Sequence, residues 1–282
     1  MKFKTFYKIF YKHRVKKANR LLKIYLFFIV PFKYLYNLFF VPIKVDLDQF
    51  EKKNIDLLNK DLNYLFDYFN SDKGNFFENQ YAQPSKRKKE KIQAHGYGNF
   101  YEKYFEKIRD KKLNILEIGS FYGNASASLF FYFRNSFLYA ADIFPDLFRY
   151  ESKRISNFFV DSSDEISIKK NIINIPTGFD VIIEDASHSL KDQIISLFLL
   201  FKKINSEGLF IIEELDFPET RKDMNLKNEK PSLKEIFQKI KKNEYFDSKY
   251  ILPEDKKYFL DNFSNIEIYK GNFNEIAIIK KK

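Results

Sequence analysis

Short runs of apolar residues alternate with longer amphipathic segments between residues 113 and 214. The short runs predict strands, and the segments with apolar side chains three and four residues apart predict helices. We expect strands over residues 113–118, 137–142, 157–161, 179–184 and 208–214, and helices over 122–133, 164–173 and 190–203. Strands that alternate with helices in this way are typical of an α/β domain with a mostly parallel sheet.

The same kind of pattern extends to both sides of this region. Residues 47–69 predict one helix with an apolar face, and 100–108 predict a short one. Ser232 followed by Glu235 forms a capping box, which predicts the start of a further helix. Alternating residues over 266–279 predict a terminal antiparallel hairpin, which would complete a Rossmann-like sheet of about seven strands.

The first 44 residues differ from the rest of the chain in charge. They contain eleven of the 49 Lys and Arg residues and no Asp or Glu, so the net charge of +11 lies entirely on this arm. Basic residues recur at every fourth position, which predicts a cationic stripe along a helix; they are Lys4, Lys8, Lys12, Lys16 and Arg20.

An apolar, aromatic segment over residues 24–42 follows the stripe, interrupted by Pro31, Lys33 and Asn37. A spanning helix needs about 20 apolar residues, and a central lysine costs a few kcal/mol there. The pattern therefore favours a helix that lies on an anionic membrane surface over one that spans it. Two alternatives stay open, in which this segment packs on the rest of the domain or against another copy of the chain in a homo-oligomer. Nothing resembles a base-reading module, so we expect no nucleic-acid partner.

The first strand of the alternating region ends in a glycine turn, Glu117-Ile-Gly119-Ser120-Phe-Tyr-Gly123. Glycine lets a backbone approach a ligand closely, since it has no Cβ. The spacing differs from the Gly-x-Gly-x-x-Gly that holds a dinucleotide pyrophosphate. We therefore expect a cofactor without a pyrophosphate at these four residues, with S-adenosylmethionine as the leading candidate.

Acidic residues follow the other predicted strands at the edge where ligands bind in open α/β sheets. Asp142 is expected to accept hydrogen bonds from both ribose hydroxyls of the cofactor. Asp161 is expected to orient the adenine amino group, with Ser162 beside it. These residues complete the cofactor site predicted from the residues alone.

A second group of chemistry-bearing residues lies at the ends of two later strands. Asp185, Glu213 and Glu214 supply hard oxygen ligands and predict a divalent cation, with magnesium favoured. His188 follows Asp185 by three residues and is expected to take a proton from an acceptor hydroxyl, since neutral histidine is basic near pH 7. The chain has no cysteine, which excludes a thiolate zinc site or a cysteine nucleophile.

Five short motifs in this order resemble a known family. They are Ser71-Asp72-Lys73-Gly74, His95-Gly96-Tyr97, Leu116-Glu117-Ile118-Gly119, Asp185-x-x-His188 and Ile212-Glu213-Glu214. Over about residues 66–282 the chain resembles class I S-adenosylmethionine-dependent methyltransferases of the macrolide-sugar (mycinamicin-type) O-methyltransferase group, and their cephalosporin hydroxylase-like relatives. The first two motifs are the most specific, and with them Lys73 and Tyr97 are expected among the cofactor-binding residues.

The resemblance implies a sugar O-methyltransferase that uses S-adenosylmethionine and magnesium. In that group the residues that match Asp185, Glu213 and Glu214 bind the metal, and the residue that matches His188 is the proposed base. This chain departs at Ala186, where glycine is usual, and at Glu214, where aspartate is usual. The extra methylene of Glu214 puts the metal site in question more than the cofactor site.

These patterns together divide the chain into an arm (1–45), a helical cap with substrate and cofactor loops (46–110) and a cofactor-binding methyltransferase domain (111–282). The basic arm favours a glycan or glycolipid acceptor at the cytoplasmic face of a membrane, and residues 216–230 are expected to form a mobile lid. Two other functions stay open. A metal-dependent hydroxylase would need His95 or His13 beside His188. A non-catalytic membrane scaffold would need only the fold.

Overall fold

The computed structural model describes residues 3, 7, 19–40, 44–78 and 91–282. The first four residues of the predicted cationic stripe, Lys4 to Lys16, lie outside this part of the chain, as does His13.

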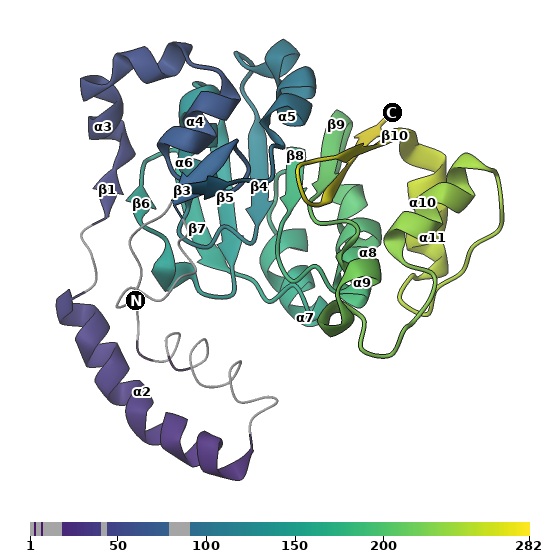
Figure 1. The fold of residues 1–282 in the computed structure, drawn as a ribbon, viewed down its shortest axis with the longest axis horizontal. Coiled ribbons are helices and arrows are strands. Elements are labelled where there is room, and N and C mark those ends of the chain that lie inside the picture. The colour runs from purple at the N-terminus through teal and green to yellow at the C-terminus, as the bar shows by residue number, and fades with distance from the viewer. Residues whose placement is uncertain (1–2, 4–6, 8–18, 41–43, 79–90) are drawn as a thin grey trace.

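A seven-stranded sheet forms the centre of the domain, in the order β10-β11-β9-β8-β4-β5-β7 (Figure 1). The strands are β4 (Asn114–Ile118), β5 (Phe137–Asp142), β7 (Ile155–Phe159), β8 (Phe179–Glu184), β9 (Ile204–Ile212), β10 (Phe263–Lys270) and β11 (Glu275–Lys281). Strands β7, β5, β4, β8 and β9 are mutually parallel, and β11 pairs antiparallel with β9 and β10. The predicted α/β class, the parallel sheet and the terminal hairpin are confirmed.

Two hydrophobic clusters cover the two faces of the sheet. Leu116 of β4 belongs to the cluster formed with α8 (Leu190–Leu200), α10 (Leu233–Lys241) and α11 (Pro253–Asn262). Its neighbour Ile115 belongs to the cluster formed with α4 (Leu62–Tyr68), α5 (Gly98–Phe105) and α6 (Asn124–Tyr132). Because successive side chains of a strand point to opposite faces, burial on both sides explains the continuous apolar runs of these strands.

The remaining elements surround this sheet. They are α2 (Arg20–Phe40), α3 (Leu47–Lys53), α4 (Leu62–Tyr68), α5 (Gly98–Phe105), α6 (Asn124–Tyr132), α7 (Glu165–Ile168), α9 (Phe217–Thr220), and the strand pairs β1 (Val45–Asp46) with β6 (Tyr150–Glu151) and β2 (Phe76–Glu78) with β3 (Lys91–Gln93). Short 3-10 or π turns extend α5, α7, α8 and α9.

The single helix expected over residues 47–69 is wrong, because the segment folds as α3, a 3-10 turn and α4. Asp61 starts α4 by accepting a hydrogen bond from the Tyr64 backbone N–H at 2.7 Å, and Asn54 leaves the helical backbone conformation. The apolar residues keep helical spacing across the interruptions at Asn54 and Asp61, so the hydrophobic pattern alone does not reveal where the helix is broken. The capping box of Ser232 and Glu235 is present at the start of α10, as predicted.

The arm contains the predicted helix, α2. Its Val30 is buried, with Tyr34 of the same helix and with Phe144 and Phe159 of the domain packed against it. Phe144 follows β5 and Phe159 ends β7, so α2 lies near the edge of the sheet where the parallel strands end (Figure 1). Among the helices that the structure describes, none combines the length and the apolar character that a bilayer span requires.

Candidate active site

A cavity of about 560 Å³ lies at the carboxyl ends of the parallel strands. Its walls contain residues from the ends of β4, β5, β7, β8 and β9, which are far apart in sequence. Seven of the predicted site residues line it: Gly119, Asp142, Asp161, Ser162, Asp185, His188 and Glu214. The topology therefore brings the two predicted groups, for a cofactor and for a cation, to one cavity.

Gly119 gives the turn after β4 a conformation that a side chain would disrupt. Its φ is +96°, and a Cβ at this position would lie 1.9 Å from the Asp185 carbonyl oxygen. Gly123 also has a positive φ, of +82°, but a Cβ there would meet the Phe148 ring. Gly123 was expected at the cofactor, yet it lies outside the cavity lining, because its role is to let α6 start against Phe148.

Backbone amides fix the two carboxylates that were expected to hold the nucleoside. Asp142 accepts hydrogen bonds from the N–H groups of Phe144 and Phe121, both at 2.7 Å. Burial raises the pKa of Asp142, while these two hydrogen bonds oppose the rise. Asp161 accepts hydrogen bonds from the Ser163 N–H at 3.1 Å and its hydroxyl at 2.6 Å. Both side chains are therefore held in one orientation at the cavity wall.

A small side cavity of about 30 Å³ lies next to the turn after β4. Glu117, Ser120 and Lys73 line this side cavity rather than the large one. Glu117 is buried and accepts a hydrogen bond from the Ser126 hydroxyl. Burial raises the pKa of Glu117 to about 7. These three predicted cofactor residues thus lie behind the turn, whereas Gly119 lines both cavities.

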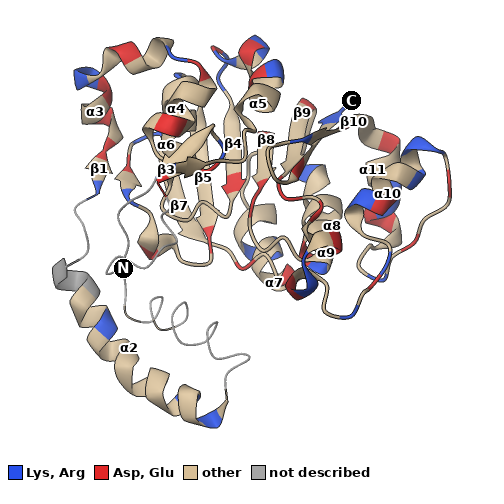
Figure 2. Ribbon diagram, in the orientation of Figure 1, with Lys and Arg blue, Asp and Glu red and all other residues tan. Residues whose placement is uncertain are grey.

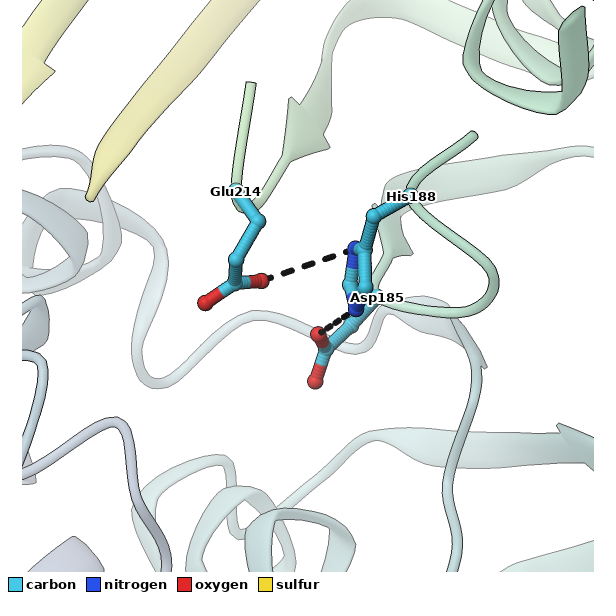
Figure 3. Close-up of side chains that lie close together, drawn as sticks. All are labelled: Asp185, His188 and Glu214. Atoms are coloured by element: carbon cyan, nitrogen blue, oxygen red, sulfur yellow. Dashed lines mark ion pairs between the residues drawn. The ribbon is translucent and has the colours of Figure 1, made fainter. Parts of the chain in front are cut away.

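Asp185, His188 and Glu214 form a compact group in the large cavity, which we term the carboxylate–histidine group (Figure 3). His188 Nε2 lies 3.7 Å from Asp185 Oδ1, and His188 Nδ1 lies 3.6 Å from Glu214 Oε2. One ligand atom from each residue lies within 4.8 Å of the others. His188 and Glu214 have positive φ values of 53° and 48°, conformations that cost non-glycine residues free energy and cluster at functional sites.

The electrostatics of the group favour a neutral imidazole and a bound cation. Burial lowers the pKa of His188, although Asp185 opposes this, so the ring is neutral near pH 7. Burial, together with Asp185 and Glu213, raises the pKa of Glu214 well above its ordinary value. The buried Nδ1 of His188 and Oε2 of Glu214 have no hydrogen-bond partner. The open carboxylate oxygen of Glu214, with the Asp185 carboxylate close by, fits a hard divalent cation such as magnesium.

Glu213 lies outside this group in the structure, and its role as a metal ligand stays a prediction. It is 1% exposed, and its two carboxylate oxygens accept hydrogen bonds from Lys73 Nζ, at 2.9 Å, and from the Tyr101 hydroxyl. Both glutamates follow β9, which ends at Ile212, and Glu214 has a left-handed backbone with a φ of 48°. Lys73 also donates a hydrogen bond to Asp185 Oδ2.

The motif His95-Gly96-Tyr97 lies behind Glu214. The Tyr97 hydroxyl and His95 Nε2 each lie 3.4 Å from Glu214 Oε1, and the two rings stack with 5.2 Å between their centroids. Tyr97 was expected to bind the cofactor, but it is fully buried and does not line the large cavity. His95 does line it and was absent from the predicted site, although its motif had been identified.

Other residues of the cavity wall had no sequence signal of their own. Phe217 and Arg221, from the segment predicted as a lid, line the cavity, with the Arg221 guanidinium 4.7 Å from the centre of the Phe217 ring. The segment contains α9 and a 3-10 turn over Lys222–Met224. Its movement as a lid stays a prediction.

The parallel sheet with its terminal hairpin, and a cavity at the strand ends, define the class I methyltransferase fold. The solved structure of the MycE methyltransferase from the mycinamycin biosynthetic pathway, in complex with Mg, SAH and mycinamycin VI, has this fold (TM-score 0.58, 18% identity, 79% of this chain and 54% of that chain). A second MycE structure, in complex with Mg and SAH, gives a TM-score of 0.56 at 19% identity over 79% of this chain and 55% of that chain.

Sequence comparisons point to the same group. The chain is 29% identical over 128 residues to the 8-demethyl-8-α-L-rhamnosyl tetracenomycin-C 2′-O-methyltransferase of Streptomyces olivaceus, and 28% identical to the L-olivosyl-oleandolide 3-O-methyltransferase of Streptomyces antibioticus. Each alignment covers 43% of this chain and 33% of the relative, so the chain matches about a third of the length of these proteins. No protein-family model matches the chain. The resemblance to sugar O-methyltransferases is thereby confirmed.

Proposed function

We propose that the protein is an S-adenosylmethionine-dependent O-methyltransferase that acts on a sugar hydroxyl. The observation that carries the proposal is the carboxylate–histidine group, which shares one cavity with Gly119 on a class I methyltransferase fold. The printed names of the two sequence relatives are those of sugar O-methyltransferases, which supports the acceptor class.

In this proposal the cofactor lies along the cavity wall formed by the ends of β4, β5 and β7. The Gly119 turn leaves room for its amino-acid portion, Asp142 accepts hydrogen bonds from the ribose hydroxyls, and Asp161 with Ser162 binds the adenine. Both aspartates are already oriented by hydrogen bonds, so little side-chain entropy is lost on binding.

His188 acts as the base. Its neutral ring takes the proton from the acceptor hydroxyl, and the oxygen attacks the sulfonium methyl group. The new O–CH3 bond forms as the S–CH3 bond breaks, and S-adenosylhomocysteine leaves. Asp185 and Glu214 would hold a magnesium ion beside the acceptor, and such an ion supplies Lewis-acid stabilisation of the negative charge on oxygen. The protein contributes mainly by positioning, because the sulfonium is already activated.

Replacement of His188 tests the base. His188→Ala should reduce methyl transfer from labelled S-adenosylmethionine to a sugar acceptor by about 10²–10⁴-fold, because the proton loses its acceptor. Cofactor affinity, measured by isothermal titration calorimetry, should stay within about threefold of the parent value. His13→Ala is the matched control. Full methyl transfer by His188→Ala would remove His188 from the mechanism.

The same samples distinguish the two other functions. A hydroxylase would bind iron through His95 and His188 and would add oxygen to its product. Among the described residues, His95 falls outside the group whose ligand atoms lie together. A scaffold would bind neither cofactor nor acceptor, and its biological activity would survive His188→Ala.

We further propose that the arm attaches the enzyme to an anionic membrane surface. Nine large apolar side chains of α2 are between 44% and 79% exposed: Leu21, Leu22, Ile24, Tyr25, Phe27, Phe28, Phe32, Leu35 and Tyr36. Figure 2 marks basic and no acidic positions on this helix. An exposed apolar helix with only positive charges suits a surface that is anionic outside and apolar beneath.

The position of α2 supports a lipid-linked acceptor for this enzyme. Val30 of α2 packs against Phe144, and Phe144 also lines the large cavity. A membrane that holds α2 would therefore lie near the entrance to the site, where a glycan or glycolipid under assembly would be presented. This arrangement favours the cytoplasmic face of a membrane, where S-adenosylmethionine is made. The division into arm, cap (46–110) and methyltransferase domain is part of this proposal.

A further inference from the structure

Arg221 is a positive charge in the wall of an otherwise acidic cavity, and the proposed reaction gives it no role. Five carboxylates line the large cavity: Asp72, Asp142, Asp161, Asp185 and Glu214. Among the described residues of that wall, Arg221 is the one lysine or arginine. Its guanidinium stays charged throughout the neutral pH range. Because the carboxylates repel an anion, Arg221 marks the part of the wall where a negative group on a ligand would bind.

The order of the strands places Arg221 on the side of the cavity away from the proposed cofactor. The sheet contains the run β9-β8-β4-β5-β7, and the proposed cofactor lies along the ends of β4, β5 and β7. His188 follows β8, whereas Arg221 follows β9 and caps the end of α9. The base therefore lies between the cofactor wall and Arg221. Arg221 belongs to the side from which an acceptor hydroxyl would reach the base.

Phe217 sets the separation between Arg221 and the base. Its ring meets the His188 ring edge-on, with 5.3 Å between the ring centroids, and the Arg221 guanidinium lies 4.7 Å from the centre of the same Phe217 ring. The Arg221 backbone N–H donates to the Phe217 carbonyl at 2.9 Å, which holds the two residues on one turn of chain. The guanidinium is thus one phenyl ring away from the base. A sugar ring is of similar size, so a sugar with its hydroxyl at His188 would bring a substituent from its far side to Arg221.

The side chain of Arg221 is available to a ligand. It is 47% exposed, and its ion-pair partner Asp223, at 2.8 Å, is 61% exposed and lies outside the cavity lining. Exposed ion pairs of this kind contribute little to stability, so a ligand can replace Asp223 at little cost. The planar guanidinium binds two oxygens of a phosphate or carboxylate side by side, which makes it selective for such groups.

We propose, on the basis of the methyltransferase function above, that the acceptor is an anionic sugar whose phosphate or carboxylate group binds Arg221 while its hydroxyl lies at His188. Arg221 is then the residue that selects charged sugars over neutral ones. A sugar phosphate under assembly on a lipid and a uronic acid of a glycan share this chemistry.

Binding of three sugar probes to the full chain, saturated with S-adenosylhomocysteine and magnesium, tests this proposal by ligand-observed NMR titration. The probes are glucose 1-phosphate, glucuronic acid and the neutral methyl glucoside. At least one charged probe should bind the parent protein about tenfold or more tightly than methyl glucoside does, and the tighter of the two identifies the charged group of the acceptor.

Replacement of Arg221 assigns this preference to its guanidinium. Arg221→Gln should remove the advantage of the charged probe, while the affinity for methyl glucoside changes by less than about threefold. Arg221→Lys should retain part of the advantage, because it keeps the charge but loses the planar fork. Arg134→Gln, which replaces an exposed arginine outside the cavity lining, is the matched control.

A preference for the charged probe that survives Arg221→Gln would overturn the proposal, because another group, such as the bound magnesium, would then hold the anion. The absence of any preference in the parent protein would also overturn it, and this comparison does not depend on a variant that folds. S-adenosylmethionine affinity, measured by calorimetry on the same samples, separates the two levels. Parent protein that binds the cofactor but shows no preference overturns the inference alone, and parent protein that binds neither cofactor nor probe overturns the function as well.

Discussion

At the scale of single residues, the environment of an acidic group decides what it can do. Asp142 and Glu213 are both buried acids at strand ends, yet one receives backbone N–H groups at a cavity wall and the other receives an ammonium and a phenol inside the domain. In the sequence, both residues showed the same two signals of a binding site: an acidic side chain and a position at the end of a strand. The donors that surround each carboxylate come from distant segments, so the sequence pattern did not separate them.

Glu267 offers a test of such environments away from the site. Its carboxylate accepts a hydrogen bond from the Tyr269 hydroxyl and lies 3.1 Å from Lys103 Nζ, and these contacts lower the pKa of Glu267 to about 2. Because the folded pKa is depressed, the stabilisation is present above the pKa of the unfolded chain, about 4.3, and is lost as the pH falls toward 2.

Glu267→Gln should therefore lower the free energy of unfolding by about 1 kcal/mol at pH 7, a value reduced for solvent screening at this half-exposed side chain. The difference from the parent protein should shrink at pH 3, as measured by urea denaturation at both pH values. Glu244→Gln, at an exposed position, is the control. A difference that stays constant between pH 7 and pH 3 would rule out an electrostatic origin.

At the scale of elements, the ends of the strands are what the site depends on. β4 and β8 are adjacent parallel strands, and the turn after β4 touches the turn after β8 where Gly119 meets the Asp185 carbonyl. The helices and strands were largely predictable, because their apolar periodicity is local. The breaks at Asn54 and Asp61 were not, since the polar residues there keep the spacing of a continuous helix.

Two glycine variants test the contact between these turns. Gly119→Ala and Gly123→Ala each place a side chain at a positive φ and should each lower stability by about 1–3 kcal/mol. Only Gly119→Ala should also weaken S-adenosylmethionine binding, by about tenfold, since it displaces the end of β8 at the cavity. Calorimetric titration of both variants provides the measurement. Equal losses of affinity would mean that Gly123 contributes to the cofactor site as the sequence motif suggested.

At the scale of the whole molecule, the position of the arm relative to the cavity is the feature with the widest consequence. The remainder of the chain carries 38 basic and 38 acidic residues, so attraction to an anionic surface would come from the arm alone. Val30 of α2 packs against Phe144 at the edge of the cavity, so the arm contacts the domain on the side where the cavity lies.

Removal of residues 1–44 should release the protein from liposomes that contain anionic lipid, while S-adenosylmethionine affinity stays within about threefold of the parent value. Co-sedimentation at low and at high salt measures the release. Neutral liposomes, and a variant with Lys23 and Lys33 replaced by Gln, serve as controls. Truncated protein that still sediments with anionic liposomes would exclude the arm as the membrane contact, and a change in oligomeric state on truncation would favour packing between copies.

The sequence by itself determined the α/β class, the seven strands, the charge of the arm and seven residues of the cavity wall, because periodicity and strand-end chemistry are local properties. Only the tertiary structure decided which acids face one another. Glu213 and Glu214 are neighbours in the chain, but residues from distant segments decide their surroundings: Lys73 donates a hydrogen bond to Glu213, and His188 lies 3.6 Å from Glu214.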